Sequence, residues 1–130
     1  MKDLDLRHIK QDSSSVTQND FKKETYMKYS VVFVTVPNKK EAKKIADSVL
    51  KEKLVACVNI VNKLESIYWW KGKIEKSNEL LLIMKTKTSL SKKLIQKIKS
   101  IHTYEVPEII FLPITDGNLD YLNWIGEETR

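Results

Sequence analysis

Hydrophobic and polar positions along the chain follow two different periods, which predicts a mixture of strands and helices. β-Branched and aromatic residues run from Tyr29 to Val36 and stop at Pro37, which is typical of a buried strand. From Asn38 to about Lys53, apolar residues recur at helical spacing with lysines opposite, and Asn38 is suited to cap that helix. The patterned region is therefore expected to begin with a strand and a helix.

Two long strand patterns then meet at Lys71-Gly72, where glycine supports the positive φ of a hairpin turn. The first arm, residues 55–70, would extend about 50 Å at about 3.3 Å per residue. A compact domain of about 100 residues has a radius of gyration of only about 13 Å. The outer part of this arm presents apolar side chains on both faces, Ile67 and Trp69 on one and Tyr68 and Trp70 on the other. We therefore expect another subunit to cover these surfaces.

The rest of the pattern predicts a helix, a strand and a final short helix. Thr88 or Ser89 is suited to cap the helix, whose apolar stripe ends at Ile101. Residues 106–114 form a strand pattern bracketed by prolines, which remove ladder donors and suit an edge or a strand terminus. A short helix rich in aromatic residues is expected after Asn118.

This order predicts an α+β fold of the ferredoxin-like βαββαβ type, with a long central hairpin and a short C-terminal helix. The two crossover helices would cover one face of the sheet. The other face carries alternate residues of all four strands, which are mainly apolar, and no helix of the half-repeats covers it. Burial of such a face favours association of several chains, because the entropy cost of association would consume only part of the apolar gain.

Composition adds limits to this interpretation. The 130 residues fit one domain, expected over residues 29–130, and the charged and polar residues 1–28 are expected to form a mobile tail. One cysteine fits a reducing compartment, and neither a signal-like nor a membrane-spanning apolar run is present. A cytoplasmic location without membrane contact is therefore expected.

The chain is basic, with a formal net charge of +6. Such a charge can attract anions, phosphate or nucleic acid. The ordinary explanation is that most lysines lie on the solvated faces of the two predicted crossover helices. The charge therefore identifies no partner.

Five short sequence motifs, in this order and spacing, resemble the CutA family of divalent-cation tolerance proteins. They are residues 54–60 (LVACVNI), 66–75 (SIYWWKGKIE), 82–86 (LIMKT), 102–110 (HTYEVPEII) and 117–125 (GNLDYLNWI). The resemblance covers about residues 30–126 and departs from the usual family proline at Thr103. It implies a tight homotrimer of ferredoxin-like subunits, similar in architecture to the PII signalling proteins, whose hairpins reach onto their neighbours. It also implies a role in copper or divalent-ion tolerance without an established catalysed reaction.

A copper site requires several thiolate or imidazole donors at one point, and the domain offers only Cys57 and His102. Cys57 lies in an apolar strand, where a small thiol is an ordinary packing residue. His102 follows a helix, where an imidazolium interacts favourably with the last carbonyls. Relatives credited with copper ligation carry donors at positions occupied here by Val34 and Ile101. Three copies of His102 around a threefold axis, binding Cu(II) or another divalent cation, remain a hypothesis.

The second candidate site is a cleft between subunits for a small polar or anionic ligand. Its expected residues combine aromatic rings, one lysine and two carboxylates: Tyr68, Trp70, Lys85, Tyr104, Glu105 and Glu108. Lys85 ends an apolar strand, and a buried lysine requires a carboxylate partner. The alternative is a salt link that joins subunits under an aromatic lid.

We expect a non-enzymatic binding or scaffold protein, because the chain has no glycine-rich phosphate loop and Cys57 has no apparent base. The alternative function is an RRM-like RNA-binding module, since the RRM has the same strand order. The aromatic consensus motif of RRM domains is missing from the sequence, and the predicted central strands are mainly aliphatic. Nucleic acid is therefore not an expected partner.

Overall fold

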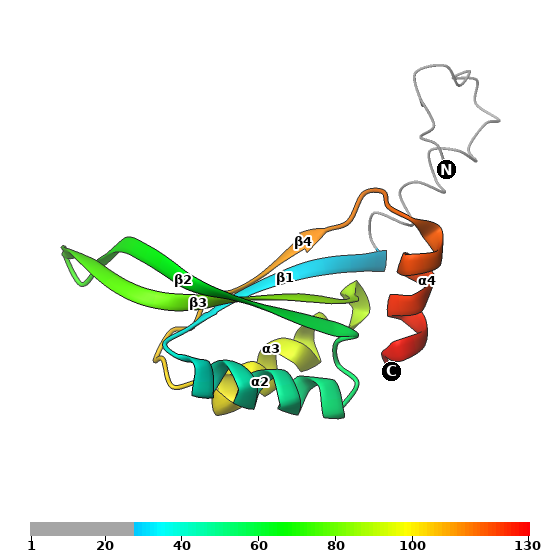
Figure 1. The fold of residues 1–130 in the computed structure, drawn as a ribbon, viewed down its shortest axis with the longest axis horizontal. Coiled ribbons are helices and arrows are strands. Elements are labelled where there is room, and N and C mark those ends of the chain that lie inside the picture. The colour runs from blue at the N-terminus through cyan, green and yellow to red at the C-terminus, as the bar shows by residue number, and fades with distance from the viewer. Residues whose placement is uncertain (1–27) are drawn as a thin grey trace, which may run out of the picture.

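The computed structural model describes residues 28–130, so the expected tail, apart from Lys28, lies outside the described residues. The order of elements confirms the ferredoxin-like βαββαβ prediction with a C-terminal helix (Figure 1). The elements are β1 (Tyr29–Val36), α2 (Lys39–Lys51), β2 (Cys57–Trp70), β3 (Lys73–Lys87), a 3₁₀ turn (Thr88–Leu90), α3 (Ser91–Ile101), β4 (Ile109–Pro113) and α4 (Leu119–Glu128).

The four strands form one antiparallel sheet in the order β2-β3-β1-β4. Figure 1 shows α2 and α3 side by side on one face of this sheet. Alternate strand residues point toward these helices and are fully buried. Together they form the main core, which includes Val32, Val34, Val36, Ala42, Ile45, Val49, Leu82, Met84, Leu94 and Ile98. The apolar stripes of the two helices thus bury one face of the sheet.

The start of α2 agrees with the sequence, and the start of α3 does not. The side chain of Asn38 accepts a hydrogen bond of 2.9 Å from the backbone N–H of Glu41, as expected for an N-cap. No side chain caps α3. The hydroxyl of Thr88 instead shares a 2.6 Å hydrogen bond with the hydroxyl of Ser30, so the first turn after β3 is a 3₁₀ turn that is tied to β1.

The hairpin of β2 and β3 reaches beyond the body of the domain (Figure 1). Its turn residues, Lys71 and Gly72, have φ angles of 51° and 83°, as a type I′ turn requires. The pairing is interrupted between Val61 and Leu64, where Lys63 has a φ of 61°. This bulge was not anticipated. It increases the local twist and re-aims the outer half of the hairpin relative to the sheet.

α4 packs at one end of the sheet, where Leu122 and Ile125 bury Tyr29. The backbone N–H of Arg130 donates a 3.1 Å hydrogen bond to the carbonyl of Lys53, which ties the end of the chain to the end of α2. The face opposite α2 and α3 is otherwise only partly covered. Among its residues, Val61, Ile110 and Leu112 are exposed.

β4 is shorter than the strand pattern over residues 106–114, because only Ile109–Pro113 pairs with β1. Pro107 has no N–H to donate, and the segment before β4 leaves the ladder. β4 lies at a sheet edge, as its prolines suggested.

In the part of the chain that the structure describes, no helix has the length and hydropathy to cross a membrane.

Candidate functional site

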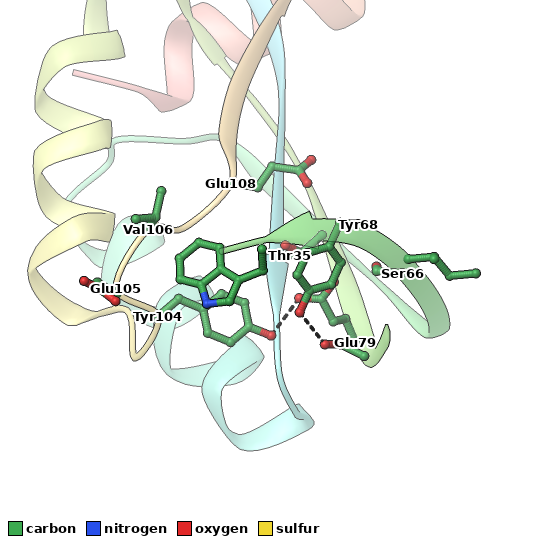
Figure 2. A pocket seen from close by; sticks show the side chains of 11 residues that line it. Thr35, Ser66, Tyr68, Glu79, Tyr104, Glu105, Val106 and Glu108 are labelled. Carbon is green, nitrogen blue, oxygen red and sulfur yellow. Dashed lines mark hydrogen bonds between the residues drawn. The ribbon is translucent and has the colours of Figure 1, made fainter. Parts of the chain in front are cut away.

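A cavity of about 600 Å³ lies between the outer hairpin and the segment that joins α3 to β4 (Figure 2). Strands β1, β2 and β3 supply one side, and residues 104–108 supply the other. The lining residues are Thr35, Ser66, Ile67, Tyr68, Trp70, Ser77, Glu79, Tyr104, Glu105, Val106 and Glu108. Five of the six residues expected for the cleft therefore line one pocket within a single chain.

The pairing of β2 with β3 decides which aromatic residues enter the cavity. Ser66 is paired with Ser77 across the hairpin. The hydroxyls of Tyr68 and Ser77 share a 2.7 Å hydrogen bond, which fixes the phenol ring against β3. Trp70 lines the cavity, whereas the adjacent Trp69 does not and is 72% exposed. The alternation predicted for the hairpin is thus confirmed at these two tryptophans.

His102 holds the opposite wall in place. Its Nε2 lies 2.8 Å from the carbonyl oxygen of Thr35, and its Nδ1 accepts a 3.0 Å hydrogen bond from the backbone N–H of Tyr104. A carbonyl only accepts and an amide N–H only donates, so this geometry requires the neutral tautomer with the proton on Nε2. The imidazole and phenol rings lie 4.7 Å apart between centroids. Both nitrogens of His102 are therefore engaged in positioning Tyr104.

Tyr104 in turn reaches Glu79, a residue that sequence reasoning missed. Its hydroxyl donates a 2.6 Å hydrogen bond to Oε2 of Glu79, drawn as a dashed line in Figure 2. Glu79 is only 7% exposed. Burial raises the pKa of Tyr104 well above its usual value, and the hydrogen bond to Glu79 adds to the increase. The one available sequence signal for Glu79 was a carboxylate immediately before the apolar run of β3.

Carboxylates dominate the polar part of the lining. Burial raises the pKa of Glu108, and the charge of Glu79 raises it further. Glu105 and Glu108 come from the segment before β4, and Glu79 comes from β3. No lysine or arginine belongs to this lining. The pocket in one chain is thus acidic, although the chain as a whole is basic.

Lys85 does not line this pocket. It is paired with Cys57 across β2 and β3, and its ammonium donates a hydrogen bond to the side-chain oxygen of Asn59. The ammonium also lies 4.0 Å from the Sγ of Cys57. Within one chain, the partner of Lys85 is therefore an amide on β2, and neither Glu105 nor Glu108.

Cys57 and His102 lie at different places in the fold. Cys57 begins β2 and is half-buried. Burial raises the pKa of the Tyr121 phenol on α4, and the interaction with Cys57 raises it further. His102 follows α3 as its C-cap residue and contacts the backbone of β1. Among residues 28–130, no three His, Cys, Asp or Glu side chains converge as metal ligands would. The described residues of one chain thus contain no assembled metal centre.

The fold and pocket define a ferredoxin-like protein with an oversized hairpin and an acidic, aromatic cavity beside it. The model of the CutA1 divalent ion tolerance protein family matches residues 30–128. The chain belongs to this family.

Relatives agree with this assignment. Protein CutA 1, chloroplastic, from Oryza sativa subsp. japonica is 54% identical over 100 residues, which cover 77% of this chain and 56% of the rice protein. The divalent-cation tolerance protein CutA of Thermus thermophilus is 48% identical over 99 residues, which cover 76% of this chain and 96% of that protein. The chain thus spans little more than half the length of the plant relative.

A solved structure supports the fold independently. The crystal structure of CutA1 from Oryza sativa superposes with a TM-score of 0.77 at 52% sequence identity. The superposition covers 82% of this chain and 97% of the rice chain. The ferredoxin-like fold predicted from the sequence is therefore confirmed.

Proposed function

We propose that this CutA-family chain acts as a homotrimer and as a non-enzymatic binding module, with its ligand site in the pocket beside the hairpin. The observation that carries the proposal is the hairpin, which leaves apolar side chains exposed on both faces. On one face, Ile67, Trp69 and Ile74 are all more than half exposed in one chain, and on the other face Tyr68 and Trp70 are 41% and 38% exposed. A neighbouring subunit laid along these residues would bury them and border the pocket at the same time.

Native mass spectrometry after mild purification tests both parts of this proposal. The expected result is a species of three times the 15.2 kDa chain mass that retains a small molecule. A matched pair of variants, Trp70→Leu in the pocket and Trp69→Leu outside it, separates the two roles. Loss of the retained molecule only in Trp70→Leu supports the ligand site. A monomer in the unmodified protein would contradict the trimer.

The divalent-cation role of the family is proposed here to operate without direct coordination by His102. Both ring nitrogens already serve Thr35 and Tyr104, so metal binding would require one of these bonds to break. Calorimetric titration with Cu(II) should give the same affinity for the unmodified protein and for a His102→Ala variant. Weaker Cu(II) binding in His102→Ala, with Cys57→Ser unchanged, would instead support a site formed by three His102 side chains.

The RRM-like alternative has less support. On the face opposite α2 and α3, the middle of the two central strands presents Val31, Phe33, Leu81 and Ile83, of which only Phe33 is aromatic. Tyr29 lies on the same face but is buried against α4. RRM domains stack bases on several aromatics at such positions. A salt-dependent gel shift with single-stranded RNA is expected to show no tight complex.

The proposed location is the cytoplasm, because a chain with a single cysteine suits a reducing compartment. The rice relative is named as chloroplastic, so its name gives no support for a cytoplasmic location. Fractionation of cells that express the full chain would decide between the compartments.

A further inference from the structure

We infer that the pocket beside the hairpin binds a small organic cation that carries an ammonium group. This inference deepens the proposed function, since it depends on the pocket being a ligand site, and it replaces the expected anionic ligand. It depends on the charge of the lining, on the aromatic walls and on the burial of one carboxylate, that of Glu79.

The negative charge of the lining favours a bound cation and disfavours a bound anion. Glu79, Glu105 and Glu108 all belong to the eleven lining residues, and none of the eleven is basic. Within residues 28–130, the glutamates that form ion pairs are Glu52 and Glu128, and both lie elsewhere. The lining in one chain thus concentrates negative charge, although the chain has a net charge of +6. The nearby Lys71 ammonium lies 5.5 Å from the ring centroid of Trp70 and, within the described part of the chain, forms no ion pair with these glutamates.

Three aromatic rings complete the lining, and two of them are fixed by hydrogen bonds at their hydroxyl ends. Tyr68 is tethered to Ser77, and Tyr104 is tethered to Glu79. Figure 2 shows that the two phenol rings reach the cavity from different elements. Trp70 is the third aromatic residue of the lining. Several aromatic faces around one space attract alkylated ammonium ions through cation–π contacts.

Glu79 provides the electrostatic reason for a bound cation. The carboxylate is more than nine-tenths buried, its single hydrogen bond comes from Tyr104, and no lysine or arginine of the described residues pairs with it. A buried charge without a counter-ion is costly. The effect extends to Glu108, whose pKa is raised by burial and by the charge of Glu79. An ammonium ion in the cavity would compensate both carboxylates.

The test is a calorimetric or NMR titration of the full chain with three probes of similar size. They are choline, its uncharged carbon analogue 3,3-dimethylbutan-1-ol, and the anion 3,3-dimethylbutanoate. Choline should bind about tenfold or more tightly than the neutral analogue, because the shapes match and only the cationic charge differs. The anion should bind least. A further titration with n-butylammonium distinguishes a primary ammonium source from a quaternary one.

Matched variants locate the binding site. Trp70→Leu and Glu108→Gln should each weaken choline binding by about tenfold, since one removes an aromatic face and the other a charge. Trp124→Leu on α4 and Glu65→Gln on β2, which change the same residue types outside the lining, should leave it unchanged. Light scattering on each variant checks that its assembly matches the unmodified protein.

The outcomes separate this inference from the proposed function. If the protein prefers the anion and Trp70→Leu still weakens binding of that anion, the ligand is not a cation, but the pocket remains a ligand site. Equal weakening of choline binding by the control variants would overturn the assignment to this pocket. Binding of no probe at millimolar concentration would overturn both the inference and the proposed ligand site.

Discussion

His102 connects two segments that are distant in the sequence and so shapes one wall of the pocket. Its ring bonds to the carbonyl of Thr35, 67 positions away, and accepts from the N–H of Tyr104 two positions on. Sequence reasoning left a structural and a metal-binding role open for this histidine. In the structure both ring nitrogens contact protein groups of the described residues, and these contacts position Tyr104.

Removal of the Tyr104 hydroxyl is expected to destabilise the fold. In Tyr104→Phe the buried Glu79 loses its hydrogen bond, which should lower the free energy of unfolding by about 1–3 kcal/mol. Tyr68→Phe is the matched control, because its bond to Ser77 is exposed and its loss should cost about 0.5–1 kcal/mol. Urea denaturation at one fixed protein concentration measures both. Equal losses would show that burial of Glu79 does not matter.

Glu108 should make stability depend on pH. Its pKa is higher in the folded state than in the unfolded state, so the folded chain binds this proton more tightly. The resulting stabilisation is complete below the unfolded pKa and is lost as the pH rises through the folded pKa. Glu108→Gln should therefore unfold at a higher urea concentration than the unmodified protein near about pH 7 and show a smaller difference near about pH 3.5.

The control for this experiment is Glu65→Gln, which removes the same charge from a position on β2 outside the pocket lining. It should show little dependence of its effect on pH. A Glu108→Gln variant that is less stable near neutral pH would indicate that the ionised carboxylate has a stabilising partner.

Five residues that line the pocket were predictable because they belong to recognisable sequence motifs. Tyr68 and Trp70 come from one such motif, and Tyr104, Glu105 and Glu108 come from another. Glu79 and Ser77 were missed because their place in the pocket depends on the register of β2 and β3, which the bulge after Val61 shifts. Local patterns do not specify that shift.

At the scale of elements, the hairpin turn is the feature that the sequence predicted most accurately. Lys71 and Gly72 both have positive φ angles and lie between two long strands, as their sequence suggested. The start of α3 was less predictable, because the hydroxyl of Thr88 bonds to Ser30 of β1 and does not cap the helix. A contact with a distant strand thus outweighed the local capping signal.

The turn offers a direct test at this scale. Gly72→Ala places a side chain at a φ of 83°, with no neighbouring atom within 4 Å, so its cost is purely conformational and should be about 1 kcal/mol. Gly117→Ala is the control, because its φ is not positive and its new Cβ would meet Leu122 at an ordinary contact distance of 3.7 Å. Thermal unfolding compares the two. An unaffected Gly72→Ala would mean that the turn does not limit stability.

At the scale of the whole molecule, the distribution of exposed apolar surface is the dominant feature. α2 and α3 bury one face of the sheet, and α4 covers Tyr29 at one end. The hairpin and the remaining sheet face keep large apolar side chains in contact with solvent, including Trp69, Ile74, Val61 and Ile110. The periodicity of the sequence predicted this imbalance, because it depends on alternation and length and not on detailed packing. We therefore expect the chain to be stable only as an assembly.

Multi-angle light scattering over a dilution series tests this expectation most directly. We expect a single species of three times the 15.2 kDa chain mass that persists to about micromolar concentration, because the buried hairpins should make the assembly tight. A folded, soluble species with the mass of one chain at that concentration would contradict it.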